Sequence, residues 1–223
     1  MHQTGGVVQA GPFAGLQYPV ARAAGSSLAP KLLGSYELEI HDFVESAIAN
    51  RPERIVNIGA GEGYYAVGMA LRVPGARVHA FDTSAPAREL TRALAENNGV
   101  AGRVHVHGEC GISELRRLAE EPSLIVCDVE GAERVLLDPR SVPGLSDCEI
   151  IAELHRVEAD DLISELRARF QATHRQRLAH FDARDVRRVP TIEYLPPRDR
   201  GIAVDERRRH GLDWIYLVPV SRQ

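Results

Sequence analysis

The chain has 223 residues, of which 44% are hydrophobic and 26% are charged. These values are ordinary for a globular protein in water, and the length fits one large α/β domain better than two small ones. The formal net charge of −4 disfavours a polyanion-binding surface, so we expect no nucleic-acid partner. The three cysteines form no CxxC pair, which predicts free thiols and a cytoplasmic location.

The first thirty residues differ in composition from the rest. Residues 1–30 are rich in Gly, Ala and Ser, and they lack the basic start and apolar block of a secretion signal. We expect a loosely ordered, flexible arm, which either stays idle or folds over a site, followed by a single domain at 31–223. No stretch approaches the roughly 20 apolar residues that a membrane helix requires, so we expect no membrane partner.

Hydrophobic periodicity predicts an alternation of strands and helices after a first helix at 35–50. The predicted strands lie at 54–58, 77–81, 103–107, 124–127, 149–154, 174–179 and 214–218, and helices separate the first five and follow the fifth. This order predicts an α/β, Rossmann-like fold, with a mostly parallel seven-stranded sheet and helices on both faces. The polar stretch 182–210 is expected to be a long loop, either a lid or poorly ordered.

A glycine-rich loop, Asn57-Ile58-Gly59-Ala60-Gly61-Glu62-Gly63, follows the first strand. Such a turn brings backbone N–H groups and a helix N-terminus close to a ligand. A dinucleotide site would need its third glycine at position 64, which is tyrosine. The glycine spacing instead predicts S-adenosyl-L-methionine as cofactor. The expected contacts in this loop are Asn57, Gly59, Ala60, Gly61, Gly63 and Tyr64.

Two further strand ends carry candidate cofactor contacts. Asp82 ends the second strand and can accept hydrogen bonds from both ribose hydroxyls, with Thr83 beside it. The alternative is that Asp82 only caps the next helix. Glu109 and Cys110 follow the third strand, where we expect the adenine amino group.

The fourth strand runs into Asp128-Val129-Glu130-Gly131-Ala132-Glu133. This segment resembles the D-x-E-G-x-E segment of the FkbM family of class I S-adenosylmethionine-dependent methyltransferases. The glycine loop followed by Tyr64-Tyr65, the Asp82 strand end, Glu96-Asn97-Asn98-Gly99 and Glu153-Leu154-His155 are also similar to that family. The resemblance covers 54–155, under half of the chain.

The resemblance implies O-methylation of a small-molecule hydroxyl, on a sugar or a specialised metabolite, in a cytoplasmic enzyme. Asn57 departs from the family, which usually has Asp at this place. Asn keeps the shape of the loop and removes a charge. The identity of the acceptor stays open. The oligomeric state also stays open, with a homodimer as one option.

Three polar side chains at neighbouring strand ends are the catalytic candidates: Asp128 on the fourth strand, and Glu153 and His155 on the fifth. Because the last two are two residues apart, they point the same way in an extended strand. Two carboxylates and an imidazole suit a divalent cation such as Mg²⁺, which would lower the pKa of an acceptor hydroxyl. Without metal, His155 is the expected general base.

Each of these residues also has a structural interpretation. Asp128 and Glu130 can cap the following helix, and Glu133 is expected to be mainly structural because acids are favoured in a first helical turn. Tyr36, Tyr64, Tyr65 and Trp214 either line a pocket or pack in the core. Three other functions stay open: a nucleic-acid or protein methyltransferase, a nicotinamide oxidoreductase opposed by Tyr64, and a non-catalytic cofactor-binding module.

Overall fold

The computed structural model describes residues 4–155, 162–181, 185–189, 192–207 and 213–221. At its centre lies a seven-stranded sheet of order β3-β2-β1-β4-β5-β7-β6. The strands are β1 (Arg54–Ile58), β2 (Arg77–Phe81), β3 (Val104–His107), β4 (Leu124–Cys127), β5 (Glu149–Leu154), β6 (His174–His180) and β7 (Asp213–Pro219). β1 to β5 are parallel, and β7 runs antiparallel to β5 and β6. The predicted Rossmann-like fold is therefore confirmed.

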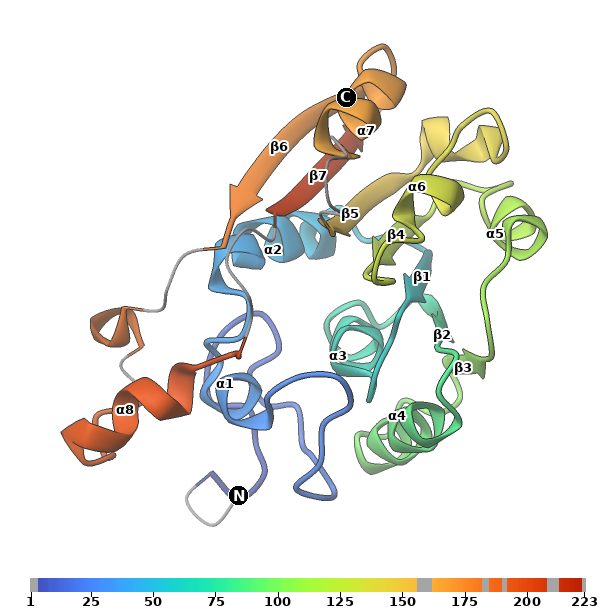
Figure 1. The fold of residues 1–223 in the computed structure, drawn as a ribbon. Helices are drawn as coiled ribbons and strands as arrows, with labels where there is room; N and C mark the ends of the chain where they lie inside the picture. The colour runs from blue at the N-terminus through green and yellow to red at the C-terminus, as the bar shows by residue number, and fades with distance from the viewer. Residues whose placement is uncertain (1–3, 156–161, 182–184, 190–191, 208–212, 222–223) are drawn as a thin grey trace.

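Helices cover both faces of the sheet (Figure 1). The helices whose apolar side chains share one core cluster are α2 (His41–Ala49), α3 (Tyr64–Arg72) and α4 (Ala85–Asn97). The helices of the second cluster are α5 (Ile112–Leu118), α6 (Glu133–Leu136) and α7 (Leu162–Phe170). Burial on both faces explains why the central strands are apolar throughout; all four residues of β4 are buried. In the part of the chain that the structure describes, no helix is long and apolar enough to cross a membrane.

The segment expected to be a loose arm is packed against the sheet domain. Phe13 and Leu16 are buried in the same core cluster as α3 and α4. Gln17 is fixed at the end of α4, where its N–H donates to Asn98 Oδ1 at 2.9 Å and its carbonyl accepts from Asn98 Nδ2 at 2.8 Å. α1 (Leu28–Leu33) then leads into the domain. The composition suggested an arm because these few apolar residues have no local periodicity, and their core partners in α3 lie far along the chain.

Phe13 also accounts for a glycine in the middle of α3. A Cβ at Gly68 would lie 2.4 Å from Cγ of the Phe13 ring, so only glycine admits the ring at this place. The same ring makes edge-to-face contacts with Tyr64 and Tyr65, at centroid distances of 5.1 and 5.7 Å. The N-terminal segment is therefore part of the core that supports the start of α3.

Two further expectations are corrected. The helix expected at 35–50 begins only at His41, as α2, after a 3₁₀ turn, η1 (Leu38–Ile40). It does not begin earlier because Glu37 has a left-handed φ of 52° and its N–H is bonded to Glu206 Oε1 at 3.1 Å. The stretch 182–210 is not a plain loop, since it contains η3 (Val186–Arg188) and α8 (Pro197–Val204). Of the basic run 207–210, only Arg207 lies in the described part, and it is exposed. The remaining short element is η2 (Pro143–Asp147).

Replacing Phe13 with Ala tests whether the N-terminal segment is part of the core. Removing a buried ring typically costs about 3–5 kcal/mol of folding stability, and we expect a loss of roughly that size in chemical denaturation. The control is Val20→Ala in the same segment, because Val20 is 43% exposed. Equal stability of the Phe13 variant and wild type would mean that the segment does not contribute to the folded core.

Candidate active site

The glycine loop joins β1 to α3 in a conformation that favours glycine. Gly59, Gly61 and Gly63 have φ values of 79°, 56° and 93°. A Cβ on Gly59 would lie 1.6 Å from the backbone oxygen of Asp128. The loop therefore lies directly against the end of β4, and this approach requires glycine at position 59.

The N–H groups of the loop are bonded within the chain. Gly59 and Ala60 both donate to the carbonyl of Phe81 at 2.9 Å, and Gly63 donates to the carbonyl of Ala60 at 2.8 Å. Gly61 donates to Asp82 Oδ2 at 2.8 Å. We expected these groups to face a ligand. Instead they fix the shape of the loop, and its two side chains, Ala60 and Glu62, are buried.

Asp82 connects the end of β2 to the glycine loop. Besides the bond from Gly61, its Oδ1 accepts from the N–H of Ser84 at 2.8 Å. Ser84 itself is the N-cap of α4, so Asp82 fixes the turn before this helix and does not cap it. A carboxylate oxygen accepts more than one hydrogen bond. Both oxygens of this half-buried carboxylate therefore keep the capacity to bind ribose hydroxyls, and Thr83 is exposed beside them.

The expected adenine contacts lie at the same edge of the sheet. The N–H of Asp82 bonds the carbonyl of His107 at 3.4 Å, which ties the ends of β2 and β3 together. Glu109 is exposed and Cys110 is buried. Burial, followed by the charge of Glu114, raises the pKa of the Cys110 thiol to about 12. The thiol therefore stays protonated and acts as a packing group; Cys127 and Cys148 are also buried, and neither forms a disulfide.

Asn57 and Tyr64 lie beneath the loop. The Asn57 side chain is 1% exposed; its Nδ2 donates to the carbonyl of Val126 at 3.4 Å, and its Oδ1 has no hydrogen-bond partner among the described residues. The Tyr64 ring is buried against Phe13 and Tyr36, at centroid distances of 5.1 and 5.5 Å. For Tyr64 the structure favours the packing interpretation, as it does for the fully buried Trp214.

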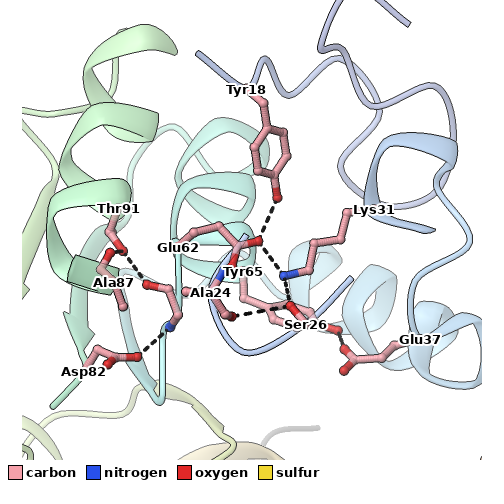
Figure 2. Close-up of polar contacts among 11 residues, drawn as sticks. Tyr18, Ala24, Ser26, Lys31, Glu37, Glu62, Tyr65, Asp82, Ala87 and Thr91 are labelled. Atoms are coloured by element: carbon pink, nitrogen blue, oxygen red, sulfur yellow. Dashed lines mark hydrogen bonds and ion pairs between the residues drawn. The ribbon is translucent and has the colours of Figure 1, made fainter. Parts of the chain in front are cut away.

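Glu62 has a role that the sequence did not reveal. Its carboxylate is buried in the glycine loop and is bonded by the N-terminal segment (Figure 2). Oε1 accepts from Lys31 Nζ at 2.5 Å and from the Tyr18 hydroxyl at 3.0 Å, and Oε2 accepts from the N–H of Ala24 at 3.0 Å. Partners 31 to 44 positions away leave no periodic signal in the sequence.

The three predicted catalytic residues meet in a group that we call the acid–histidine cluster: Asp128, Glu130, Glu133, Glu153 and His155. His155 Nε2 lies 3.6 Å from Asp128 Oδ1 and 3.6 Å from Glu153 Oε2. It also lies 3.4 Å from Oε2 of the exposed Glu130. Neighbouring parallel strands place these groups together, because β4 and β5 end side by side.

Glu133 belongs to this cluster, although we expected it to be mainly structural. It is fully buried at the start of α6, and its Oε1 bonds His155 Nδ1 at 2.8 Å as well as the N–H of Val129 at 3.1 Å. Its Oε2 is buried and has no hydrogen-bond partner among the described residues. By holding Nδ1, Glu133 directs Nε2 of His155 toward the other acids.

Two acids of the cluster, Asp128 and Glu153, resist ionisation. Burial, then the nearby Asp128, raises the pKa of Glu153, and burial also raises the pKa of Asp128. These two carboxyl groups therefore share a proton. Burial opposes protonation of His155, but the hydrogen bond and charge of Glu133 outweigh it, so the pKa of His155 is raised. Strongly shifted pKa values gathered in one place are typical of functional sites.

The donor set of the cluster fits a divalent cation. One ligand atom each from Asp128, Glu133 and His155 lie within 4.8 Å of one another. Carboxylate oxygens with one imidazole suit magnesium, manganese or zinc. Of the predicted ligands, Asp128 and His155 belong to this set, and Glu133 is its third member. The third predicted ligand, Glu153, lies beside the set, 3.6 Å from His155 Nε2.

No protein-family profile matches the chain. A release factor glutamine methyltransferase of Chlorobaculum tepidum is 46% identical over 50 residues, which are 22% of this chain and 17% of that protein. The fold is similar to the O-methyltransferase TomG of Streptomyces achromogenes, solved with S-adenosylmethionine, with a TM-score of 0.52, 12% identity and coverage of 78% and 77% of the two chains. It is also similar to an O-methyltransferase of Bacillus cereus, solved with S-adenosylhomocysteine, with a TM-score of 0.51, 14% identity and coverage of 78% and 77%.

Replacing Glu153 with Gln tests the proton balance of the cluster. Because the folded-state pKa of Glu153 is raised, its contribution to stability is present below its unfolded pKa of about 4.3 and is lost as pH rises toward the folded pKa. Wild type in chelator should therefore lose stability from pH 5 to pH 8, by up to about 1.4 kcal/mol per pH unit for one proton that only the folded state holds. We expect the Gln variant to lose less over the same range, because its amide does not titrate.

The control for this measurement is Glu121→Gln, since Glu121 is 68% exposed. Its stability should follow wild type at every pH. If Glu153→Gln were less stable than wild type by the same amount at pH 5 and at pH 8, the Glu153 carboxyl would be ionised at both pH values and purely structural.

The site and the fold lead to one conclusion. The carboxyl edge of a parallel sheet carries a glycine loop, a strand-end Asp and a buried acid–histidine cluster. Open α/β sheets bind their ligands at this edge. The chain has the Rossmann-like fold of class I S-adenosylmethionine-dependent methyltransferases.

Proposed function

We propose that the chain is an S-adenosylmethionine-dependent methyltransferase of the FkbM type, which methylates a hydroxyl group of a small molecule. The observation that carries the proposal is the contact between Gly59 and the backbone of Asp128. It puts the glycine loop directly beside the acid–histidine cluster. A methyl donor held by the loop would thus lie next to groups that can bind an acceptor and take its proton.

The residues at the carboxyl edge fit the parts of the cofactor. Asp82 has spare acceptor capacity for a ribose diol, and Glu109 and Cys110 border the place expected for adenine. The buried Oδ1 of Asn57, without a partner among the described residues, is an acceptor of the kind that a ligand ammonium group satisfies. Asn57 thereby keeps a polar function despite departing from the Asp of the FkbM pattern.

The chemistry asked of the chain itself is modest. When bound, the cofactor supplies an already activated methyl group, so the protein must align the acceptor and exclude water. A hydroxyl acceptor must also lose a proton. Glu133 holds Nδ1 of His155, which leaves Nε2, beside Asp128, as the proton acceptor. The raised pKa of His155 makes it a stronger base once it is deprotonated.

A divalent cation is a second way to make the acceptor hydroxyl lose its proton. Asp128, Glu153 and His155 Nε2 would hold it, with Glu133 orienting the imidazole. Such a cation would lower the pKa of the acceptor hydroxyl, and its charge would offset the repulsion that raises the pKa of Glu153.

Methylation of a protein amide is the second candidate. The 50-residue match to a release factor glutamine methyltransferase favours it. That match covers only 22% of this chain. Asp128-Val129-Glu130-Gly131 argues against a nucleic-acid acceptor, because amino-methylating nucleic-acid enzymes often carry Asn-Pro-Pro-aromatic at this place. A small molecule that carries a hydroxyl therefore remains the acceptor that we propose.

Thermal-shift measurements test the cofactor class. A ligand at 100 times its Kd stabilises a protein by about 2.7 kcal/mol, which corresponds to a Tm increase of roughly 5–10 °C at this chain length. We expect this increase with S-adenosylmethionine and S-adenosylhomocysteine, and none with NAD. Stabilisation by NAD alone would contradict the proposed function.

Calorimetry tests the metal. Wild type is titrated with Mg²⁺, Mn²⁺ and Ca²⁺, and we expect binding that is lost in Asp128→Asn. Asn keeps the volume of the side chain and removes a ligand charge. If neither protein binds any of the three ions, and methyl transfer is unchanged by chelator, then His155 acts without metal.

A further inference from the structure

The glycine loop is covered by an N-terminal strap, which we define as residues 18–31. Figure 2 shows the strap beside Glu62, with Tyr18, Ala24 and Lys31 reaching toward its carboxylate. Glu62 is 2% exposed and Lys31 is 4% exposed. An ion pair this deeply buried is tolerated only if both groups are well bonded.

Lys31 meets that requirement. Its ammonium group also bonds Ser26 Oγ at 2.7 Å, and it lies 4.6 and 5.3 Å from the ring centroids of Tyr36 and Tyr64. The charge of Lys31 keeps Glu62 ionised: burial alone would raise the pKa of this carboxyl, yet its pKa is lowered. The pair therefore joins the strap to the loop through a fixed set of bonds.

The strap also touches the loop backbone next to Glu62. A Cβ on Gly61 would lie 3.2 Å from the carbonyl oxygen of Ala24. On its other sides, the Gly61 peptide is held by Asp82, which accepts its N–H, and by the Thr91 hydroxyl, which donates to its carbonyl at 2.9 Å. Releasing the strap would therefore free one side of the peptide that bonds the proposed ribose-binding carboxylate.

We propose that Lys31 and Glu62 are positioning residues of the cofactor site, and that docking of the strap and binding of the cofactor stabilise each other. The proposal rests on the cofactor class proposed above. Coupling of this kind is reciprocal: if the docked strap raises cofactor affinity, bound cofactor holds the strap in place by the same factor. A purely structural strap would affect folding stability and leave the affinity of the folded protein unchanged.

The first test compares affinities of the folded proteins. S-adenosylhomocysteine is titrated into wild type, Lys31→Met and Tyr18→Phe by calorimetry, well below each Tm. We expect Kd to rise at least tenfold in Lys31→Met, and by a smaller factor in Tyr18→Phe, which loses one hydroxyl and keeps its ring. The matched control is Arg54→Met, which removes an ion pair with Glu121 at the opposite edge of the sheet and should leave Kd within twofold.

The second test uses an exposed cleavage site inside the strap. Arg22 is exposed between Tyr18 and Ala24, both of which bond Glu62. Trypsin cleavage after Arg22, followed by mass spectrometry, should slow at least fivefold when S-adenosylhomocysteine saturates wild type. Cleavage after Arg140, an exposed residue beyond α6, should not change. This readout needs no variant, so it holds even if Lys31→Met does not fold.

Three results would overturn the proposal. The first two are an unchanged Kd in folded Lys31→Met and Tyr18→Phe, and a rate of cleavage after Arg22 that does not depend on the ligand. Either one leaves the proposed function standing, because wild type still binds the ligand. The third is the absence of any S-adenosylhomocysteine binding by wild type, which would overturn the cofactor class together with the coupling.

Discussion

The contact between the glycine loop and the end of β4 is the constraint on which the rest of the site depends. Pairing of β1 with β4 brings Ile58 opposite Cys127, and the N–H of Asp128 continues the ladder to the carbonyl of Ile58 at 2.9 Å. The chain can turn at this point only because Gly59 has no side chain. One backbone approach thus places the glycine loop and the Asp128 carboxylate side by side.

Two buried acids at the carboxyl edge of the sheet have pKa values that are shifted in opposite directions. Glu62 faces the ammonium group of Lys31, and its pKa is lowered. Glu153 faces Asp128, and its pKa is raised because burial and a second carboxyl group both oppose its charge. A neutralised ion pair stabilises one conformation, whereas a carboxyl group that holds a proton can exchange it or bind a cation. By this contrast, Glu62 is suited to fixing the conformation of the loop, and Glu153 and Asp128 are suited to proton transfer or cation binding.

The features with local patterns could be predicted from the sequence. Hydrophobic periodicity predicted the seven strands, and the order of strands and helices predicted the parallel sheet. Strand ends then predicted that Asp128, Glu153 and His155 would meet, because neighbouring parallel strands end at one edge. Glu133 was assigned a structural role, since a first helical turn explains an acid there without any contact to β5.

The features without local patterns could not be predicted in this way. Phe13 and Tyr18 have no periodic neighbours, so the segment 1–30 that holds them resembled a loose arm. Their partners are Gly68 and Glu62, which lie 55 and 44 positions further along the chain. A glycine inside a helix and an acid between two glycines were the available signals. Both indicate a close approach from elsewhere, and neither identifies the segment that approaches.

A crystal structure with S-adenosylhomocysteine tests the proposed cofactor site most directly. We predict electron density along the carboxyl edge of β1 to β4, with the ribose hydroxyls on Asp82 and the sulfur facing Asp128 and the acid–histidine cluster. Density for the ligand at another place, or with its sulfur turned away from Asp128, would contradict this placement of the site.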